Sequence, residues 1–273
     1  MRILYKLTMC AVSLLAIAGC TKNVLDYGDV EKLTGDEALL KINNVSMYAN
    51  NRTAFYKING QRVSGPLTAR SPFPGGGYNT GGDSKPDFLV VQPGEINLSV
   101  VMPKKKDDGT DSVVLYSTTL NVDAGKKYSL HLTDTAANVK KLLTEENFVM
   151  PDSGFARYRF VNLIPNVAAV DLYYGRTAVT AADQSADSLV LGNVPLLQMS
   201  PEFRMRAGGQ IGGVLGIWKI RPAGAAKTAT TLLASYASAS SVLNRRIYTA
   251  FACGYSGKTI ASQRPYVSFY LVR

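Results

Sequence analysis

The sequence predicts an all-β protein made of two tandem domains of the sandwich or barrel type. Short runs of alternating apolar and polar residues recur along the chain, as in strands with one buried face. Clusters of Gly, Pro, Asn and Asp separate these runs, as turns require. An internal repeat relates the first half of the chain to the second, which indicates two copies of one β-domain.

The N-terminal residues predict an exported, lipid-anchored protein. Arg2 and Lys6 flank the start of an apolar run that is too short to span a bilayer. The run ends in "LAIAGC", which resembles the lipobox of bacterial lipoproteins, in which the cysteine thiol receives a diacylglycerol and the new amino terminus is acylated. We therefore predict a lipoprotein signal peptide over 1–19, lipidation at Cys20 and a polar tether over 20–36. The alternative is a plain signal peptide with an incidental cysteine.

The residue after the predicted lipidated cysteine indicates which bacterial membrane holds the protein. Thr21 stands where lipoproteins retained at the inner membrane often have Asp. By that resemblance the sequence favours lipid anchoring in the outer membrane, and it leaves open the cell surface or the periplasmic face. Multiple acyl chains would hold such a protein on the membrane stably.

Alternation and turn signals place the strands. The first domain, 37–150, contains predicted strands at 38–45, 53–58, 95–102, 113–122 and 127–134. The second domain, 151–273, contains predicted strands at 156–163, 169–174, 202–207, 213–220, 231–237, 246–253 and 266–272. One short helix is predicted over 136–147. The joint lies near 144–154, where a proline and polar residues interrupt the pattern, so a fragment starting near Pro151 is expected to fold alone.

The repeat is visible without gaps. "ALLKINNV", from Ala38, aligns with "ARYRFVNL", from Ala156, and the same offset places Phe55 over Tyr173. "KKYSLHLTD" resembles "RRIYTAFAC" once two residues are inserted. Asn44 and Asn162 then occupy equivalent inward positions at strand ends, where we expect their amides to bond the backbone.

The opening of the second copy resembles a known family. The stretch "SGFARYRFVNLIPNVAAVDLYYG" (153–175) is similar to the start of the domain-of-unknown-function 4397 family, and the matching residues are Phe160, Val161, Asn162, Pro165, Val170, Asp171 and Tyr173. The first copy has diverged, with Met47 in place of the proline. The resemblance covers most of 38–273 and implies immunoglobulin-like, antiparallel β-sandwich domains on an exported, often lipid-anchored protein. It implies no known reaction.

Charge and cysteine content narrow the function classes. Cleavage after residue 19 removes Arg2 and Lys6 and no acid, so the formal net charge falls from +10 to +8. A basic chain often binds nucleic acid, but export argues against that partner. Anionic lipid headgroups, lipopolysaccharide and acidic polysaccharide fit better, and scattered surface charge is the alternative. Only Cys253 remains besides the lipidated residue, so the mature chain has no intramolecular disulfide.

No catalytic, metal or cofactor motif is recognised. His131 is the only histidine, and alternation in "YSLHLTD" places it on the solvent side. A G-x-S-x-G elbow is absent, and one histidine with one apolar-flanked cysteine is too few for a structural zinc site. The glycine-rich stretch 71–83 matches no phosphate-binding pattern. The same alternation predicts a core position for Trp218 and an exposed one for Tyr173.

The one candidate ligand-binding segment is the long loop 66–86. Long ordered loops are often functional, and Arg70, Tyr78 and Asn79 offer a cation, a ring and an amide. Disorder is the alternative. The sequence thus favours a non-enzymatic envelope lipoprotein that binds a glycan or protein partner or is structural. The alternative is a fimbrial, pilin-like subunit or adhesin assembled by strand addition, with 266–272 apolar enough to be the added strand. The oligomeric state is left open.

Overall fold

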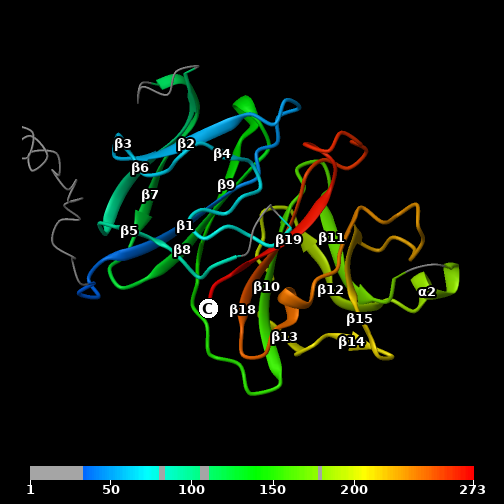
Figure 1. Ribbon diagram of the computed structural model, residues 1–273. Helices are drawn as coiled ribbons and strands as arrows, with labels where there is room; N and C mark the ends of the chain where they lie inside the picture. Colours follow the sequence, from blue (N-terminus) through cyan, green and yellow to red (C-terminus); the bar gives the residue numbers. More distant parts are fainter. Residues whose placement is uncertain (1–32, 80–83, 105–110, 178–179) are drawn as a thin grey trace, which may run out of the picture. The chain divides into compact units, whose positions relative to one another are not determined.

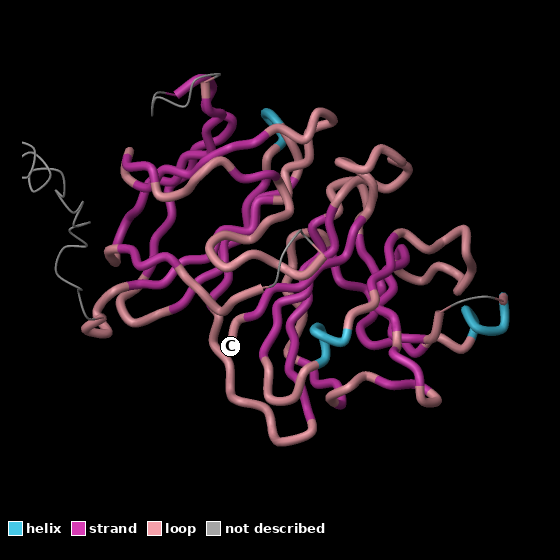
Figure 2. Tube along the Cα trace, viewed as in Figure 1, coloured by secondary structure: helices cyan, strands magenta, loops and turns pink. Residues whose placement is uncertain are grey.

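The computed structural model describes residues 33–79, 84–104, 111–177 and 180–273 (Figure 1). The predicted signal peptide, Cys20 and most of the predicted tether lie outside the described residues. Residues Gly35–Arg273 form one compact unit. Within it, strands and their connections make up nearly all of the described chain (Figure 2), which confirms the all-β prediction.

The first half forms one β-sandwich. One sheet has the order β5 (Leu89–Val91), β1 (Ala38–Asn44), β8 (Lys127–Thr133), β9 (Lys140–Glu145). The other has the order β3 (Gln61–Arg62), β2 (Thr53–Ile58), β6 (Gly94–Pro103), β7 (Asp111–Val122), with β4 (Leu67–Thr68) also paired to β2. The alternation read in the sequence sets the inner face, because Leu40 and Ile42 of β1 pack with Leu98 of β6 in a buried core.

The second half repeats this architecture. One sheet has the order β13 (Phe203–Arg206), β10 (Phe155–Leu163), β18 (Ile247–Cys253), β19 (Tyr266–Leu271). The other has the order β12 (Ser188–Pro195), β11 (Ala169–Gly175), β16 (Ile217–Pro222), β17 (Ala234–Tyr236), and the hairpin β14 (Gln210–Ile211), β15 (Val214–Leu215) lies apart. Trp218 is fully buried in this core, as predicted, and its indole nitrogen donates to the hydroxyl of Ser241 at 3.1 Å.

The sequence repeat is also a repeat of register. Leu40 pairs with Tyr128 in the first sandwich, and the aligned residues Tyr158 and Tyr248 pair in the second. Tyr128 and Tyr248 are two residues further apart in the chain than Leu40 and Tyr158. The pairing therefore agrees with the two-residue insertion found when "KKYSLHLTD" is aligned with "RRIYTAFAC". The side chains of both strand-end asparagines also behave alike. The Oδ1 atom of each accepts a backbone N–H two residues on, as predicted.

Two features of the sheets differ from expectation. In the described part, β1 runs parallel to β8 and β10 parallel to β18, while the remaining pairings are antiparallel. A parallel pair needs a long crossover, and the intervening strands of each sandwich supply it. The segment predicted as a helix over 136–147 instead forms a short 3-10 turn, η1 (Ala136–Asn138), followed by strand β9. Pairing with β8 overrides helix propensity there.

A third core joins the two sandwiches. We call it the seam: the outer face of sheet β5-β1-β8-β9 and the facing residues of β10, β18 and β19. Its apolar part includes Met47, Val161, Leu163, Phe251 and Tyr270, all buried. Polar groups are buried there too, and Thr133 Oγ1 donates to the carbonyl oxygen of Leu163 at 2.6 Å. Each of these two sheets is therefore covered on both faces.

The seam corrects the prediction for His131. Its side chain is fully buried rather than exposed, because the face that alternation assigned to solvent packs against the second sandwich. The His131 and Tyr270 rings lie 6.3 Å apart between centroids. Tyr173, predicted on an exposed face, is also buried, because Arg221 and Lys227 cover its ring. Alternation separated the two faces correctly but did not reveal what covers the second.

Candidate functional site

The predicted loop crosses from the first sandwich to the second. Its Phe73 exchanges backbone hydrogen bonds with Ile42 of β1, and five residues later Tyr78 N donates to Phe269 O of β19 at 2.7 Å. The Ser268 hydroxyl donates to the carbonyl oxygen of Tyr78. The Tyr78 side chain enters the second core, with its ring centroid 6.0 Å from that of Tyr248. The described part of this loop is ordered by these contacts.

The other two predicted residues flank this attachment. The exposed Asn79 donates through Nδ2 to the carbonyl oxygen of Val267 at 3.2 Å. The Arg70 guanidinium stacks on the Tyr266 ring, 4.8 Å from its centroid, and Nη2 donates to the carbonyl oxygen of Ala261 at 3.0 Å. The structure therefore brings Arg70 and Asn79 to one region of the second sandwich, while it buries the side chain of Tyr78 beneath that region.

An open groove lies in this region. We call it the junction groove, and the residues of its lining that matter here are Asn79, Ile217, Tyr236, Lys258, Arg264 and Tyr266. Its volume is about 730 Å³, within the range of about 300–1,000 Å³ typical of ligand pockets. The first half contributes Asn79, and β16, β17, β19 and the connection between β18 and β19 contribute the rest. The groove thus lies on the second sandwich, and the loop of the first half adds one residue to its lining.

The junction groove is basic and carries two tyrosine rings. Lys258 and Arg264 are exposed, and the residues that line the groove include no Asp or Glu among the described ones. Partial burial raises the pKa of the Tyr266 phenol to about 12, so this ring stays neutral at physiological pH. Tyr236 is half-buried, and its ring packs 5.8 Å from Phe269. Cations and flat apolar rings therefore lie side by side.

The connection that carries the two cations is held in place by the first sandwich. The Ser262 hydroxyl donates to the carbonyl oxygen of Ala49 at 2.7 Å, and Gln263 Nε2 donates to that of Met47 at 3.4 Å. At its start, Gly254 has φ +93°, and a Cβ there would overlap the carbonyl of Arg264. The connection is therefore fixed at its base, and Lys258 and Arg264 are presented from a supported loop.

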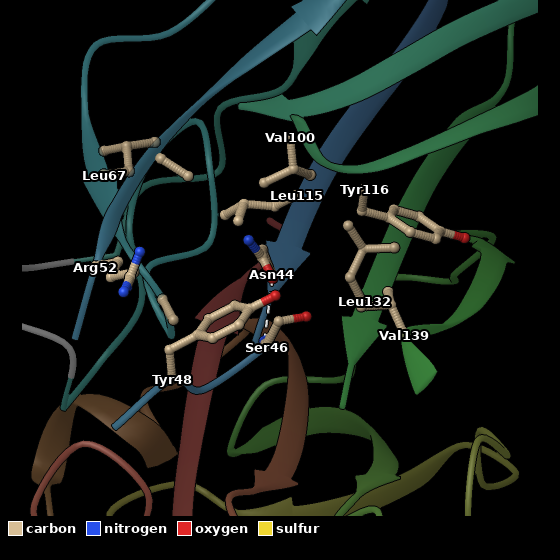
Figure 3. Close-up of a pocket in the computed structure, with 12 residues that line it drawn as sticks. Asn44, Ser46, Tyr48, Arg52, Leu67, Val100, Leu115, Tyr116, Leu132 and Val139 are labelled. Atoms are coloured by element: carbon tan, nitrogen blue, oxygen red, sulfur yellow. Dashed lines mark hydrogen bonds between the residues drawn. The ribbon is translucent and has the colours of Figure 1, made fainter. Parts of the chain in front are cut away.

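Two other cavities serve as comparisons. The cavity in Figure 3, lined in part by Asn44, Ser46, Tyr48 and Arg52, holds about 20 Å³. A single water needs about 10–15 Å³ on the same measure, so this cavity is water-sized. A second open groove of about 900 Å³, which we call the β13 groove, runs along Phe203–Arg206. Its Arg204 already has a carboxylate partner, with Nη1 at 3.9 Å from Asp152 Oδ2.

The buried ionisable groups are engaged in packing. Burial lowers the pKa of His131 from 6.5 to about 3, so the imidazole is neutral, and the amide nitrogen of Asn43 lies 3.1 Å from its Nδ1. In the seam, Glu146 accepts from Tyr270 OH at 3.0 Å and from Thr249 Oγ1 at 3.2 Å. Within the described residues there is no grouping of three His, Cys, Asp or Glu side chains that could hold a metal ion.

A second buried charge cluster supports the outer sheet of the second sandwich. Lys219 Nζ lies 2.6 Å from Asp187 Oδ1, and Arg221 Nη2 lies 3.0 Å from Asp187 Oδ2. All three side chains are almost fully buried beside helix α2 (Ala181–Ser185). The arrangement fixes the segment that follows α2 on the sheet.

Sequence reasoning found only part of the junction groove. It selected Arg70 and Asn79 from the length and composition of their loop. It missed Tyr236, Lys258, Arg264 and Tyr266, which come from segments far from that loop in the chain. No local motif marks them, since only the pairing of β16 with β17 and of β18 with β19 brings them together.

One comparison with known proteins gives a match. The family model described as Domain of unknown function (DUF4397) matches residues 37–173. The matched span covers the first sandwich and continues through β10 to Tyr173 in β11. No curated protein matches the chain.

Proposed function

The chain belongs to the domain of unknown function (DUF4397) family, and from this premise we propose that it is a non-enzymatic lipoprotein of the bacterial cell envelope, anchored in the outer membrane through Cys20. Its two sandwiches act together as one rigid binding module that presents the junction groove. The observation that carries the proposal is a groove of ligand size on the second sandwich, to whose lining the loop of the first sandwich adds Asn79. Its ligand is a glycan of the envelope or its surroundings.

Several features support this proposal. "LAIAGC" supplies the lipidation signal, and none of the helices in the described ranges is long and apolar enough to cross a bilayer. A preformed groove on a supported loop binds with little loss of conformational entropy, which suits a binding module. The lone histidine is neutral and enclosed, which leaves it badly placed to act as a general base on a substrate.

The fimbrial alternative is less well supported. The terminal strand proposed as an added strand is β19, which pairs with β18 along its length and carries Phe269 and Tyr270, both fully buried. The loop at Tyr78 bonds its other edge. Donation of this strand to a neighbouring copy would empty both the second core and the seam, so we do not propose strand addition through it.

Fractionation tests the anchor. We expect the wild-type protein in the membrane pellet and in the detergent phase of a phase-separation assay, and Cys20→Ala in the soluble fraction. A Cys253→Ala variant controls for thiol loss, since that buried side chain is far in sequence from the signal. Recovery of Cys20→Ala in the membrane fraction would contradict the anchor.

A glycan array tests the binding function. The full-length protein in detergent is expected to bind at least one glycan class, and Tyr236→Ser is expected to reduce that signal. Tyr116→Ser, which changes a tyrosine of the first sandwich away from the groove, is the matched control. An array without any signal above background would argue against a glycan-binding module.

A further inference from the structure

We propose that the junction groove binds an acidic polysaccharide, with carboxylates of the ligand against Lys258 and Arg264 and sugar rings against the tyrosines. This inference rests on the proposed function and assigns it a ligand class. Three observations carry it: cations without an ion-pair partner among the described residues, half-buried tyrosine rings that line the groove, and a supported loop.

No Asp or Glu among the described residues neutralises the charges of the groove. Across the described part of the chain, the side chains of Lys258 and Arg264 form no ion pair with Asp or Glu. Some other surface cations have such partners: Arg157 Nη1 lies 2.6 Å from Glu202 Oε1, and Lys126 Nζ lies 3.0 Å from Asp123 Oδ2. A groove with unpaired cations and no lining acid concentrates anions.

Arg70 extends the positive edge of the groove. Its guanidinium stacks on the Tyr266 ring at 4.8 Å from the centroid and is anchored by the Ala261 carbonyl. Arginine presents a planar fork that matches a carboxylate with two parallel hydrogen bonds. Together with Arg264, it places such forks near the ring of Tyr266, which suits a ligand with regularly spaced carboxylates.

The tyrosines select a sugar chain among anionic ligands. Tyr236 and Tyr266 are both half-buried, so each ring is held by packing while part of it lines the groove. Aromatic rings provide flat apolar surface at low entropic cost, and sugar rings offer a matching face of C–H groups. An open groove of about 730 Å³ admits a continuous chain rather than enclosing a small molecule.

The β13 groove provides a control with the same number of cations at a different site. It is larger and contains Arg204 and Arg206, but the guanidinium of Arg204 stacks on Phe155 at 4.7 Å from the ring centroid and has Asp152 as a partner. Removing its two arginines therefore changes the net charge as much as removing Lys258 and Arg264, without touching the proposed site. It is the matched control.

The test uses the full-length protein in a zwitterionic detergent that carries no sugar. The probes are polygalacturonate, its fully methyl-esterified form, which has the same backbone without the charge, and single-stranded DNA as a polyanion without sugar carboxylates. Affinities are measured by interferometry for the wild type, Lys258→Gln/Arg264→Gln, Tyr236→Ser and the control Arg204→Gln/Arg206→Gln. Unchanged melting temperatures verify that each variant is folded.

We expect the wild type to bind polygalacturonate and to bind the ester roughly tenfold or more weakly. Loss of the two groove cations is expected to weaken binding roughly tenfold, and high salt is expected to weaken it further. Tyr236→Ser is expected to weaken it as well, and the control variant to leave it unchanged.

Four outcomes would overturn the proposal. Equal affinity for the acid and the ester would indicate a neutral-glycan site, and in that case the proposed binding function would stand while the ligand class would fall. Equal binding of single-stranded DNA, or equal loss in the control variant, would indicate a general effect of net charge. Absence of polygalacturonate binding, with signal for another glycan on the array, would also reject the acidic class.

Discussion

The backbone nitrogen of Tyr78 donates a 2.7 Å hydrogen bond to the carbonyl oxygen of Phe269, so the first sandwich bonds the free edge of the last strand of the second. The Tyr78 side chain follows into the second core. A loop of one sandwich thereby completes the other, and the two halves are structurally dependent although each has its own core.

Tyr78→Ala tests this dependence. The side chain is only 7% exposed and packs beside Tyr248, so its removal leaves a cavity in the second core. We expect the free energy of unfolding to fall by about 3–5 kcal/mol in chemical denaturation. The neighbouring Asn79→Ala removes one exposed hydrogen bond and should cost about 1 kcal/mol or less. Equal small losses for both variants would mean that the loop only rests on the surface.

His131 makes stability sensitive to acid. Its folded-state pKa is lowered from 6.5 to about 3 by burial, so below pH 6.5 the unfolded chain binds a proton that the folded one excludes. Proton binding by the unfolded chain therefore lowers the free energy of unfolding as the pH falls from 6.5 towards 3. Between pH 7 and pH 5 the loss is about 2 kcal/mol. We expect His131→Gln to lack this loss, so that between pH 7 and pH 5 its free energy of unfolding, measured in urea titrations, falls by about 2 kcal/mol less than that of the wild type. Parallel pH profiles for the two proteins would contradict the burial of this side chain.

Lys41 produces the same trend, a rise of stability with pH, in the alkaline range. Burial lowers its pKa from 10.5 to about 8, against the raising effect of Asp87 and Glu146. Between these values the unfolded chain holds the proton more tightly, so the contribution of Lys41 to stability rises with pH, by about 2 kcal/mol from pH 7.5 to pH 9.5.

Lys41→Met is the variant that isolates this contribution. The wild type should gain stability relative to Lys41→Met over this range in paired unfolding curves. A constant difference between the two curves would show that the ammonium is solvated rather than enclosed in the seam.

The buried pair of cations beside α2 depends on one carboxylate. Asp187→Asn leaves Lys219 and Arg221 buried without a counter-charge, and we expect a loss of about 3–5 kcal/mol in the free energy of unfolding. The control is Glu202→Gln, which breaks the partly exposed pair with Arg157 and should cost about 1 kcal/mol or less. Comparable losses for the two variants would contradict the claim that the buried ion pairs of Asp187 contribute more to stability than the partly exposed pair.

The sequence predicted strands, repeat and core faces because these are local or periodic properties. The alternation that placed Leu40 and Trp218 inside depends only on neighbouring residues. His131 and the segment that became β9 were mispredicted because both depend on a contact between distant parts of the chain. β9 shows this directly: Leu143 packs on the first core and Leu142 in the seam.

The candidate site was only partly predictable for the same reason. The loop drew attention through its length and its glycines, and it supplies Asn79 to the groove and Arg70 to its edge. The partners on β17, β19 and the connection before β19 become visible only when the second sandwich is closed and the loop is attached to it.

The seam changes what we expect of a fragment that starts near Pro151, which the sequence alone predicts to fold by itself. A fragment starting near Pro151 would expose Val161, Leu163, Phe251 and Tyr270, which are all buried in the intact chain. It would also lack Tyr78 in its core. We therefore expect far-UV circular dichroism with strand content but a weak near-UV signal, as in a loosely packed state.

Differential scanning calorimetry of the full-length protein tests the central claim most directly, namely that the two sandwiches and their seam form one cooperative unit. We expect a single transition whose calorimetric enthalpy equals its van't Hoff enthalpy. Two resolved transitions, of which the second is unchanged by Tyr78→Ala, would show two independent domains and contradict it.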